Sequence, residues 1–247
     1  MDLDLTGKLA VVTGASKGIG ASIARTLARE GCDLVLVARD ADALQSVAAS
    51  ISEETGRRTH VLVADLSNRD DVERLTQQWS EADILINNAG AIPGGRIDQV
   101  DEATWRAAWD LKVFGYVNLT RAFYAGMITR GHGVIVNIVG AAAQIRDPSY
   151  ICGVTANAAL VAFTMSLGSD SHIHGVRIVG VSPGPVATER LLQLDGMVKS
   201  SAARPFGRAA SPEEIASATA FLASPKSGYT SGTVLTIDGG ISARAAT

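Results

Sequence analysis

The residues of this sequence that most clearly prepare a chemical site form a glycine-rich segment near the N-terminus, Thr13-Gly14-Ala15-Ser16-Lys17-Gly18-Ile19-Gly20. An apolar, β-rich run precedes the segment and a helix-like stretch follows it. Its three glycines permit a tight turn and a close approach of the backbone to a ligand. Free N–H groups at the start of the following helix attract a pyrophosphate. We therefore predict a dinucleotide site, with contacts from Gly14, Ser16, Lys17, Gly18, Ile19 and Gly20.

The end of the second apolar run, Val37-Ala38-Arg39, bears on which dinucleotide binds. Sites selective for NAD place an acid at this point to bind the ribose 2′-hydroxyl. Here no acid ends the run, and the Arg39 guanidinium and the Lys17 ammonium together could receive a 2′-phosphate. The sequence therefore favours NADP(H) over NAD(H). The alternative is that Arg39 pairs with Asp40 or Asp42 on the surface.

These residues need a scaffold, and the pattern of the whole chain predicts one. Short apolar runs without polar alternation suit strands buried on both faces of a parallel sheet, and amphipathic stretches between them suit helices. We expect strands at Lys8–Thr13, Asp33–Ala38, Thr59–Ala64, Asp83–Asn87, Val134–Ile138, Arg177–Val181 and Val234–Ile237, and helices at 18–30, 41–54, 68–80, 101–130, 149–171 and 212–223. This alternation predicts one α/β domain over residues 1–247, a three-layer, doubly wound, Rossmann-like sandwich. Its seven-stranded parallel sheet would carry three helices on each face.

Composition narrows the class of protein. The chain has 247 residues, of which 47% are hydrophobic and 19% charged, enough for a large core. Its formal net charge of −3 and pI of about 5.8 predict neither a nucleic-acid nor a membrane partner. The two cysteines are too few for a disulfide framework, and His172-x-His174 is better read as a solvated turn than as a metal site. We expect a reduced, cytoplasmic protein without a metal.

Four further segments extend the pattern: Ala64-Asp65-Leu66, Asn87-Asn88-Ala89-Gly90, Pro183-Gly184-Pro185-Val186-Ala187-Thr188 and Ile237-Asp238-Gly239-Gly240. With the glycine-rich segment they resemble the short-chain dehydrogenase/reductase family over about residues 5–240. The resemblance implies that the first meets the adenine, the second lines the cofactor site and the third contacts the nicotinamide carboxamide. It adds as cofactor contacts Asp65, Leu66, Asn88, Ala89, Gly90, Pro183, Gly184, Val186 and Thr188.

The resemblance also implies a small-molecule substrate and a homotetramer or homodimer. The subunits would meet through the long helices 101–130 and 149–171. Trp105, Trp109 and Phe114 lie along the first of these helices, where we expect them in the core or in an interface.

The family's customary catalytic residues are missing. It uses a Tyr-x-x-x-Lys pair, a Ser thirteen residues before the Tyr, and an Asn on the preceding long helix. Aligned by the apolar segment that follows, Asn157 stands where the Lys belongs, Gly153 replaces the Tyr and Gly140 the Ser. Lys112 occupies the place of the helical Asn. The family's roles therefore do not transfer to these four positions.

One interpretation is a rebuilt active site. Tyr150 lies one helical turn before Gly153, hence on a similar face, and the glycines leave room for its ring. We predict that Tyr150 and Lys112 provide the proton and that Asn157 orients the substrate or a water. The alternatives are that Tyr150 packs in a subunit interface and that Lys112 pairs with Asp110 or reaches solvent.

Two other interpretations stay open. An oxidoreductase without a dedicated side-chain acid would still gain rate from holding the substrate against the nicotinamide. A protein that binds NADP without redox chemistry would be a sensor, a scaffold subunit or a non-redox enzyme on the same fold. The first two interpretations predict an oxidoreductase acting on an alcohol or a carbonyl compound, while the third predicts binding alone.

Overall fold

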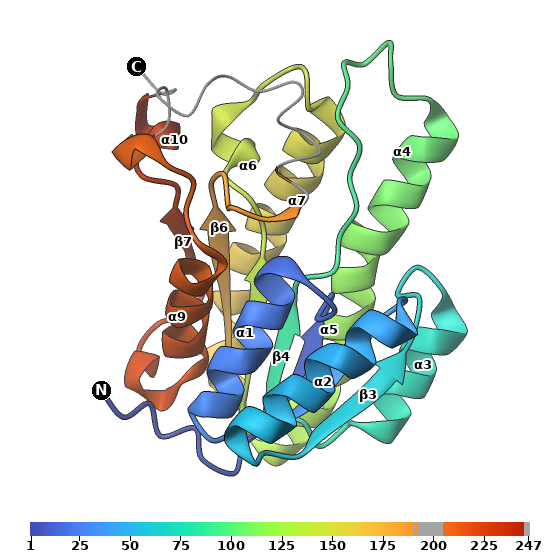
Figure 1. Cartoon of the computed structure of the whole chain (residues 1–247). Helices are drawn as coiled ribbons and strands as arrows, with labels where there is room; N and C mark the ends of the chain where they lie inside the picture. Colours follow the sequence, from blue (N-terminus) through green and yellow to red (C-terminus); the bar gives the residue numbers. More distant parts are fainter. Residues whose placement is uncertain (190, 192–204, 245–247) are drawn as a thin grey trace.

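A computed structural model describes residues 1–189, 191 and 205–244, and the segment after the sixth strand is thus only partly described. Seven parallel strands form one sheet in the order β3-β2-β1-β4-β5-β6-β7 (Figure 1). They are β1 (Leu9–Thr13), β2 (Asp33–Ala38), β3 (Thr59–Val63), β4 (Ile84–Asn87), β5 (Gly133–Ile138), β6 (Val176–Pro183) and β7 (Val234–Ile237). The order reverses between β1 and β4, and ligands of such sheets bind beyond the strand ends at this point.

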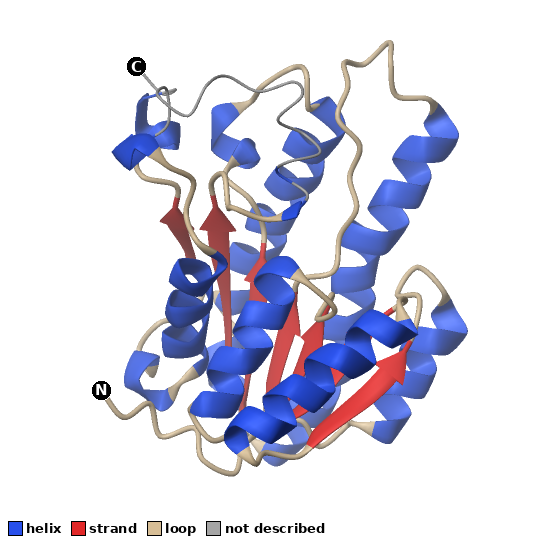
Figure 2. Cartoon of the chain, viewed as in Figure 1, coloured by secondary structure: helices blue, strands red, loops and turns tan. Residues whose placement is uncertain are grey.

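Helices cover both faces of the sheet (Figure 2). One face carries α1 (Gly18–Arg29), α2 (Ala41–Thr55) and α9 (Pro212–Ala223), and the other carries α3 (Arg69–Gln78), α5 (Gly115–Arg130) and α7 (Ile151–Gly168). Shorter elements are α4 (Glu102–Trp109), η1 (Asp110–Phe114), α6 (Ala142–Ile145), η2 (Ser171–His174), η5 (Pro205–Gly207), η6 (Pro225–Ser227) and α10 (Ile241–Arg244). The predicted fold class, including three helices per face, is confirmed.

The strand ends and helix starts follow from local chemistry. All residues of β4 and nearly all of β1 and β2 are buried, as an apolar run without alternation predicts. Asn68 caps α3, and Ser211 forms a reciprocal capping box with Glu214 at the start of α9. These two signals fix where α3 and α9 begin.

The long helix predicted at 101–130 is wrong in one respect. It is interrupted at Asp110–Phe114 by a π-helical turn, so α4 and α5 are separate elements. A π-turn holds an extra residue and rotates the side chains that follow it. Nothing in the hydrophobic pattern distinguishes such a turn from a regular helix. Lys112 lies in the middle of the turn.

Helix α7 is long and apolar enough to cross a membrane by length and composition, but 44% of its residues are buried inside the structure. It packs against β6 of the sheet. Core helices of globular proteins pass the same test, so this feature is weak evidence for a membrane span.

Candidate functional site

The glycine-rich segment forms a cradle that side chains would fill. Gly14 and Gly18 have φ angles of 63° and 56°, a conformation that glycine adopts without strain. A Cβ placed on Gly20 would lie 2.1 Å from the carbonyl oxygen of Gly14. The first turn of α1 therefore approaches the loop before it as closely as only glycine allows.

The end of β4 braces this cradle. The Asn88 side chain donates to the carbonyl oxygens of Thr13 and Gly14 at 3.0 and 3.2 Å. The Thr13 hydroxyl accepts from the backbone N–H groups of Asn88 and Ala89 at 2.9 and 3.1 Å. Asn88, Ala89 and the glycines, all predicted cofactor contacts, are therefore brought together at the switch between β1 and β4.

The residues after β6 lie across the same cradle. A Cβ on Gly18 would be 3.3 Å from Thr188 Cγ2, and the Lys17 ammonium pairs with Glu189 at 3.1 Å. Both partners are exposed, so the pair adds little to stability. Sequence reasoning missed Glu189, because no spacing rule links it to Lys17. In the sequence, residues 186–210 show no clear period, which is typical either of a mobile flap or of an ordinary ordered excursion, and most of them lie outside the described part of the chain.

Arg39 and Asp65 meet at the ends of β2 and β3. Their charged groups are 3.8 Å apart, and Asp40 instead caps α2 by accepting from the N–H of Ala43. Burial raises the pKa of Asp65, but hydrogen bonds from Ser67 and the Arg39 charge outweigh it and hold this pKa below its usual range. Arg39 therefore pairs with Asp65, another predicted cofactor contact, and not with Asp40 or Asp42 as the alternative interpretation had it.

The ring of Tyr150 fills the space above Gly153. Tyr150 stands at the N-cap of α7, and a Cβ on Gly153 would lie 2.0 Å from its Cε1 and 2.1 Å from its Cζ. A side chain at 153 and the present position of this ring thus exclude each other. The phenol ring of Tyr150 therefore occupies the space that a side chain at position 153 would need.

Asn157 and Gly140 form a second such pair. A Cβ on Gly140 would lie 2.9 Å from Asn157 Nδ2, and Gly140 adopts a φ of 148°. Asn157 is 3% exposed, and its Oδ1 is buried without a hydrogen-bond partner among the described residues. A buried amide oxygen in this state is costly unless a water or ligand satisfies it.

Lys112 reaches the same corner from η1. Its ammonium donates to the carbonyl oxygen of Val139 at 2.8 Å, and its Cδ would be 3.1 Å from a Cβ on Gly90. This hydrogen bond to a backbone carbonyl was not among the expected alternatives for Lys112, which were a pair with Asp110 and a solvated amine. The ammonium of Lys112 contacts Val139, and the amide of Asn157 lies against Gly140. These two groups therefore contact neighbouring residues just after β5.

Tyr150 packs against an apolar cluster. Its members are Ile92, Ala108, Val113, Cys152 and Ala156, with Trp105, Trp109 and Tyr150 packed against them. Burial raises the pKa of the Cys152 thiol, which disfavours the reactive thiolate. Cys152 therefore acts as a small packed side chain of this cluster.

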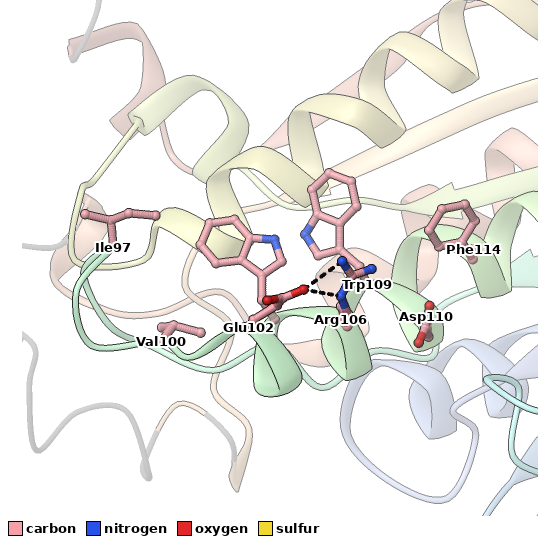
Figure 3. Close-up of a pocket in the computed structure, with 8 residues that line it drawn as sticks. Ile97, Val100, Glu102, Arg106, Trp109, Asp110 and Phe114 are labelled. Atoms are coloured by element: carbon pink, nitrogen blue, oxygen red, sulfur yellow. Dashed lines mark hydrogen bonds and ion pairs between the residues drawn. The ribbon is translucent and has the colours of Figure 1, made fainter.

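A pocket of about 510 Å³ lies beside this cluster (Figure 3). The residues lining it are Ile97, Val100, Glu102, Trp105, Arg106, Trp109, Asp110 and Phe114. Glu102 and Arg106 form an ion pair at 2.7 Å on its wall, and Phe114 is 51% exposed. Trp105 and Trp109 pack against the buried cluster, while Phe114 is exposed, so the expectation of a place in the core or in an interface stays a prediction for Phe114.

The pair His172-x-His174 has a structural place. His172 and His174 lie in η2, and the ring of His174 packs edge-on against Tyr124. Among the residues that the structure describes, no three His, Cys, Asp or Glu side chains are grouped to hold a metal.

Comparison with known proteins places these observations in a family. A family model described as enoyl-(acyl carrier protein) reductase matches residues 14–242. Galactitol 2-dehydrogenase (L-tagatose-forming) of Cereibacter sphaeroides is 35% identical over 248 residues, covering 96% of this chain and 95% of that enzyme.

Solved structures agree. A short chain dehydrogenase/reductase family protein superimposes with a TM-score of 0.91 at 39% identity, covering 98% of this chain and all of the other. L-Sorbose reductase from Gluconobacter frateurii, complexed with NADPH and L-sorbose, gives a TM-score of 0.90 at 31% identity, covering 98% of each chain.

Proposed function

Because the chain belongs to the short-chain dehydrogenase/reductase family, we propose that it is an NADP(H)-dependent oxidoreductase with a rebuilt proton-transfer site. In this proposal, Lys112, Tyr150 and Asn157 act on an alcohol or carbonyl substrate. The observation that carries it is the Tyr150 ring lying over Gly153, where a Cβ would be 2.0 Å away. A phenol is thus supplied at the turn where the family's own tyrosine is absent.

The residues of the cradle fit such a cofactor. Gly14, Gly18 and Gly20 leave room that any Cβ would occupy, and the start of α1 offers N–H groups to a pyrophosphate. Arg39 and Lys17 carry the charge expected to hold a 2′-phosphate, which supports NADP(H) over NAD(H). The binding of NADPH by the similar L-sorbose reductase points the same way.

Each of the three side chains has a distinct task in this mechanism. When bound, the cofactor supplies a hydride to the substrate carbon during reduction or accepts one during oxidation. Tyr150 gives its phenol proton to the substrate oxygen and recovers a proton from solvent. The Lys112 ammonium stabilises the phenolate. The buried Oδ1 of Asn157, which has no hydrogen-bond partner among the described residues, accepts a hydrogen bond from the hydroxyl of an alcohol substrate or from a water beside it.

A turnover assay tests the function. Purified protein is mixed with NADPH and a series of ketoses and other carbonyl compounds, and NADPH oxidation is followed by absorbance while binding is measured by calorimetry. We expect oxidation that depends on one substrate class. Tight binding of NADPH with no oxidation by any compound, and no reduction of NADP⁺ by polyols, would contradict the proposal and favour a nucleotide-binding protein without redox chemistry.

We also propose that the chain forms a homodimer or homotetramer through α4, α5 and α7. Helix α7 has no charged residue and a mean hydropathy of 1.6, yet less than half of it is buried, and Met165 on it is 49% exposed. The aromatic pocket beside α4 adds a second apolar surface on the same side. Light scattering coupled to size exclusion should give a multiple of 25.6 kDa, and a monomer at micromolar concentration would contradict this assembly.

A further inference from the structure

The carbonyl that anchors Lys112 belongs to the ladder between β5 and β6. Beyond the end of β5, the N–H of Val139 donates to the carbonyl of Val181 at 2.8 Å, and the N–H of Ala141 donates to the carbonyl of Pro183 at 2.8 Å. In a parallel pair, a residue donates to one neighbour and accepts from the residue two positions further on. Residue 183 therefore stands where the donor to the Val139 carbonyl belongs.

Proline cannot fill that role. It has no backbone N–H, and its ring carbon occupies the place of the hydrogen. Val139 is only 4% exposed, so its carbonyl oxygen would otherwise be a buried acceptor without a donor. The Lys112 ammonium supplies the missing hydrogen bond at 2.8 Å.

A second side chain, one turn further along the η1–α5 segment, makes a similar hydrogen bond. The hydroxyl of Tyr116, one turn after Lys112, donates to the carbonyl of Ile138 at 3.0 Å. Two successive carbonyls at the end of β5 thus accept from two side chains of the η1–α5 segment. The amine is thereby held against the strand end and beside Gly140.

We infer that Pro183 is a positioning residue for Lys112. By withholding a ladder donor, Pro183 leaves the Val139 carbonyl free to anchor the ammonium beside Gly140 and Asn157. The anchoring of Lys112 rests on the hydrogen bond to Val139 and on the ladder position of Pro183. Its effect on turnover rests on the proposed function. A proline read from sequence as a cofactor contact therefore gains a second task.

A double-mutant cycle in protein stability tests the anchoring without any assay of turnover. Lys112→Met leaves the Val139 carbonyl without a donor, so it should lower the urea midpoint of unfolding. Pro183→Ala restores an N–H at that carbonyl, so the same lysine substitution should lower the midpoint by at most half as much in that background. Pro183→Ser restores the same N–H and serves if the alanine variant does not fold. Equal shifts in both backgrounds would overturn the inference.

Pro185→Ala is the matched control. Pro185 lies two residues further on, beyond the end of β6, and its position in the ladder is not the one that pairs with the Val139 carbonyl. The midpoint shift caused by Lys112→Met should be the same in this background as in the natural chain. A shift reduced as much as in the Pro183→Ala background would show a general effect of the loop and overturn the inference.

Kinetics then separate the inference from the proposed function. If Lys112 acts in turnover, Pro183→Ala should lower kcat between about tenfold and a hundredfold with little change in KM, and should move the pH profile of kcat. A changed stability cycle with unaltered turnover in Lys112→Met would retain the anchoring and refute the catalytic role. An additive cycle refutes the anchoring whatever the kinetics show.

Discussion

The glycine cradle and the corner between β5 and α7 lie on the same edge of the sheet, yet they are built by different means. The cradle works through backbone N–H groups and empty space, so its chemistry depends on glycines and on the bracing of Asn88. The corner works through side chains that must arrive from elsewhere: Tyr150 over Gly153, Asn157 against Gly140, and Lys112 on Val139. The glycine cradle is encoded by one short motif. The corner depends on pairs of residues from different elements, so a side chain lost at one position can be supplied from another.

The largest effect should come from Lys112→Met, which separates the two regions. Removing a group that stabilises proton transfer should lower kcat by about 10²- to 10⁴-fold and leave the Kd for NADPH unchanged, because the cradle is intact. Steady-state kinetics and calorimetry measure the two quantities. Lys226→Met is the control, since that surface lysine pairs with Asp4 far from the site. A loss of cofactor affinity as large as the loss of kcat would show that the regions are not separate.

Gly153→Ala should damage the corner by steric overlap. The new methyl would lie 2.0 Å from Cε1 of Tyr150 and force its ring away, so kcat should fall by more than about tenfold. The same substitution made together with Tyr150→Ala should cost less stability than it does alone, because the overlap is gone. Thermal unfolding of the three variants measures this coupling. If the stability effects are additive, the ring does not fill this space.

Arg39→Gln should affect the cradle alone. Losing one charge-assisted contact to a 2′-phosphate should weaken NADPH binding by about tenfold and leave NADH binding unchanged. Arg69→Gln is a suitable control, because its guanidinium pairs with Glu73 on the outer surface of α3. Equal losses for both coenzymes would assign Arg39 to the packing of Asp65 instead.

The smallest effect concerns the start of α9. Hydrogen bonds from Arg208 and the N–H of Ser211 lower the pKa of Glu214 to about 2, from 4.5. Since the folded value lies below the unfolded one, this contribution is present above about pH 4.5 and is lost as the pH falls toward 2. Acid unfolding of Glu214→Gln should therefore be less steep over this range, measured by circular dichroism. A parallel acid curve would mean that the pair adds no stability.

Much of this molecule could be predicted from its sequence, for reasons that are local. Strand runs and the Ser211 cap are short-range signals, and the glycine at 20 is required by a contact only six residues away. The contact of Lys112 with Val139 could not be predicted, because it depends on a π-turn and on the ladder position of Pro183. Glu189 was missed because its pair with Lys17 crosses 172 positions of the chain.

The proposed role of Tyr150 in proton transfer is tested most directly by a single turnover of the Tyr150→Phe variant. NADPH is bound first, a substrate found by the carbonyl series is added, and hydride transfer is followed by stopped-flow fluorescence. This substitution removes only the hydroxyl and leaves the ring over Gly153. We therefore predict unchanged binding of NADPH and a rate of hydride transfer at least about a hundredfold lower. A transfer rate equal to that of the natural chain would contradict the role of Tyr150 as the proton donor.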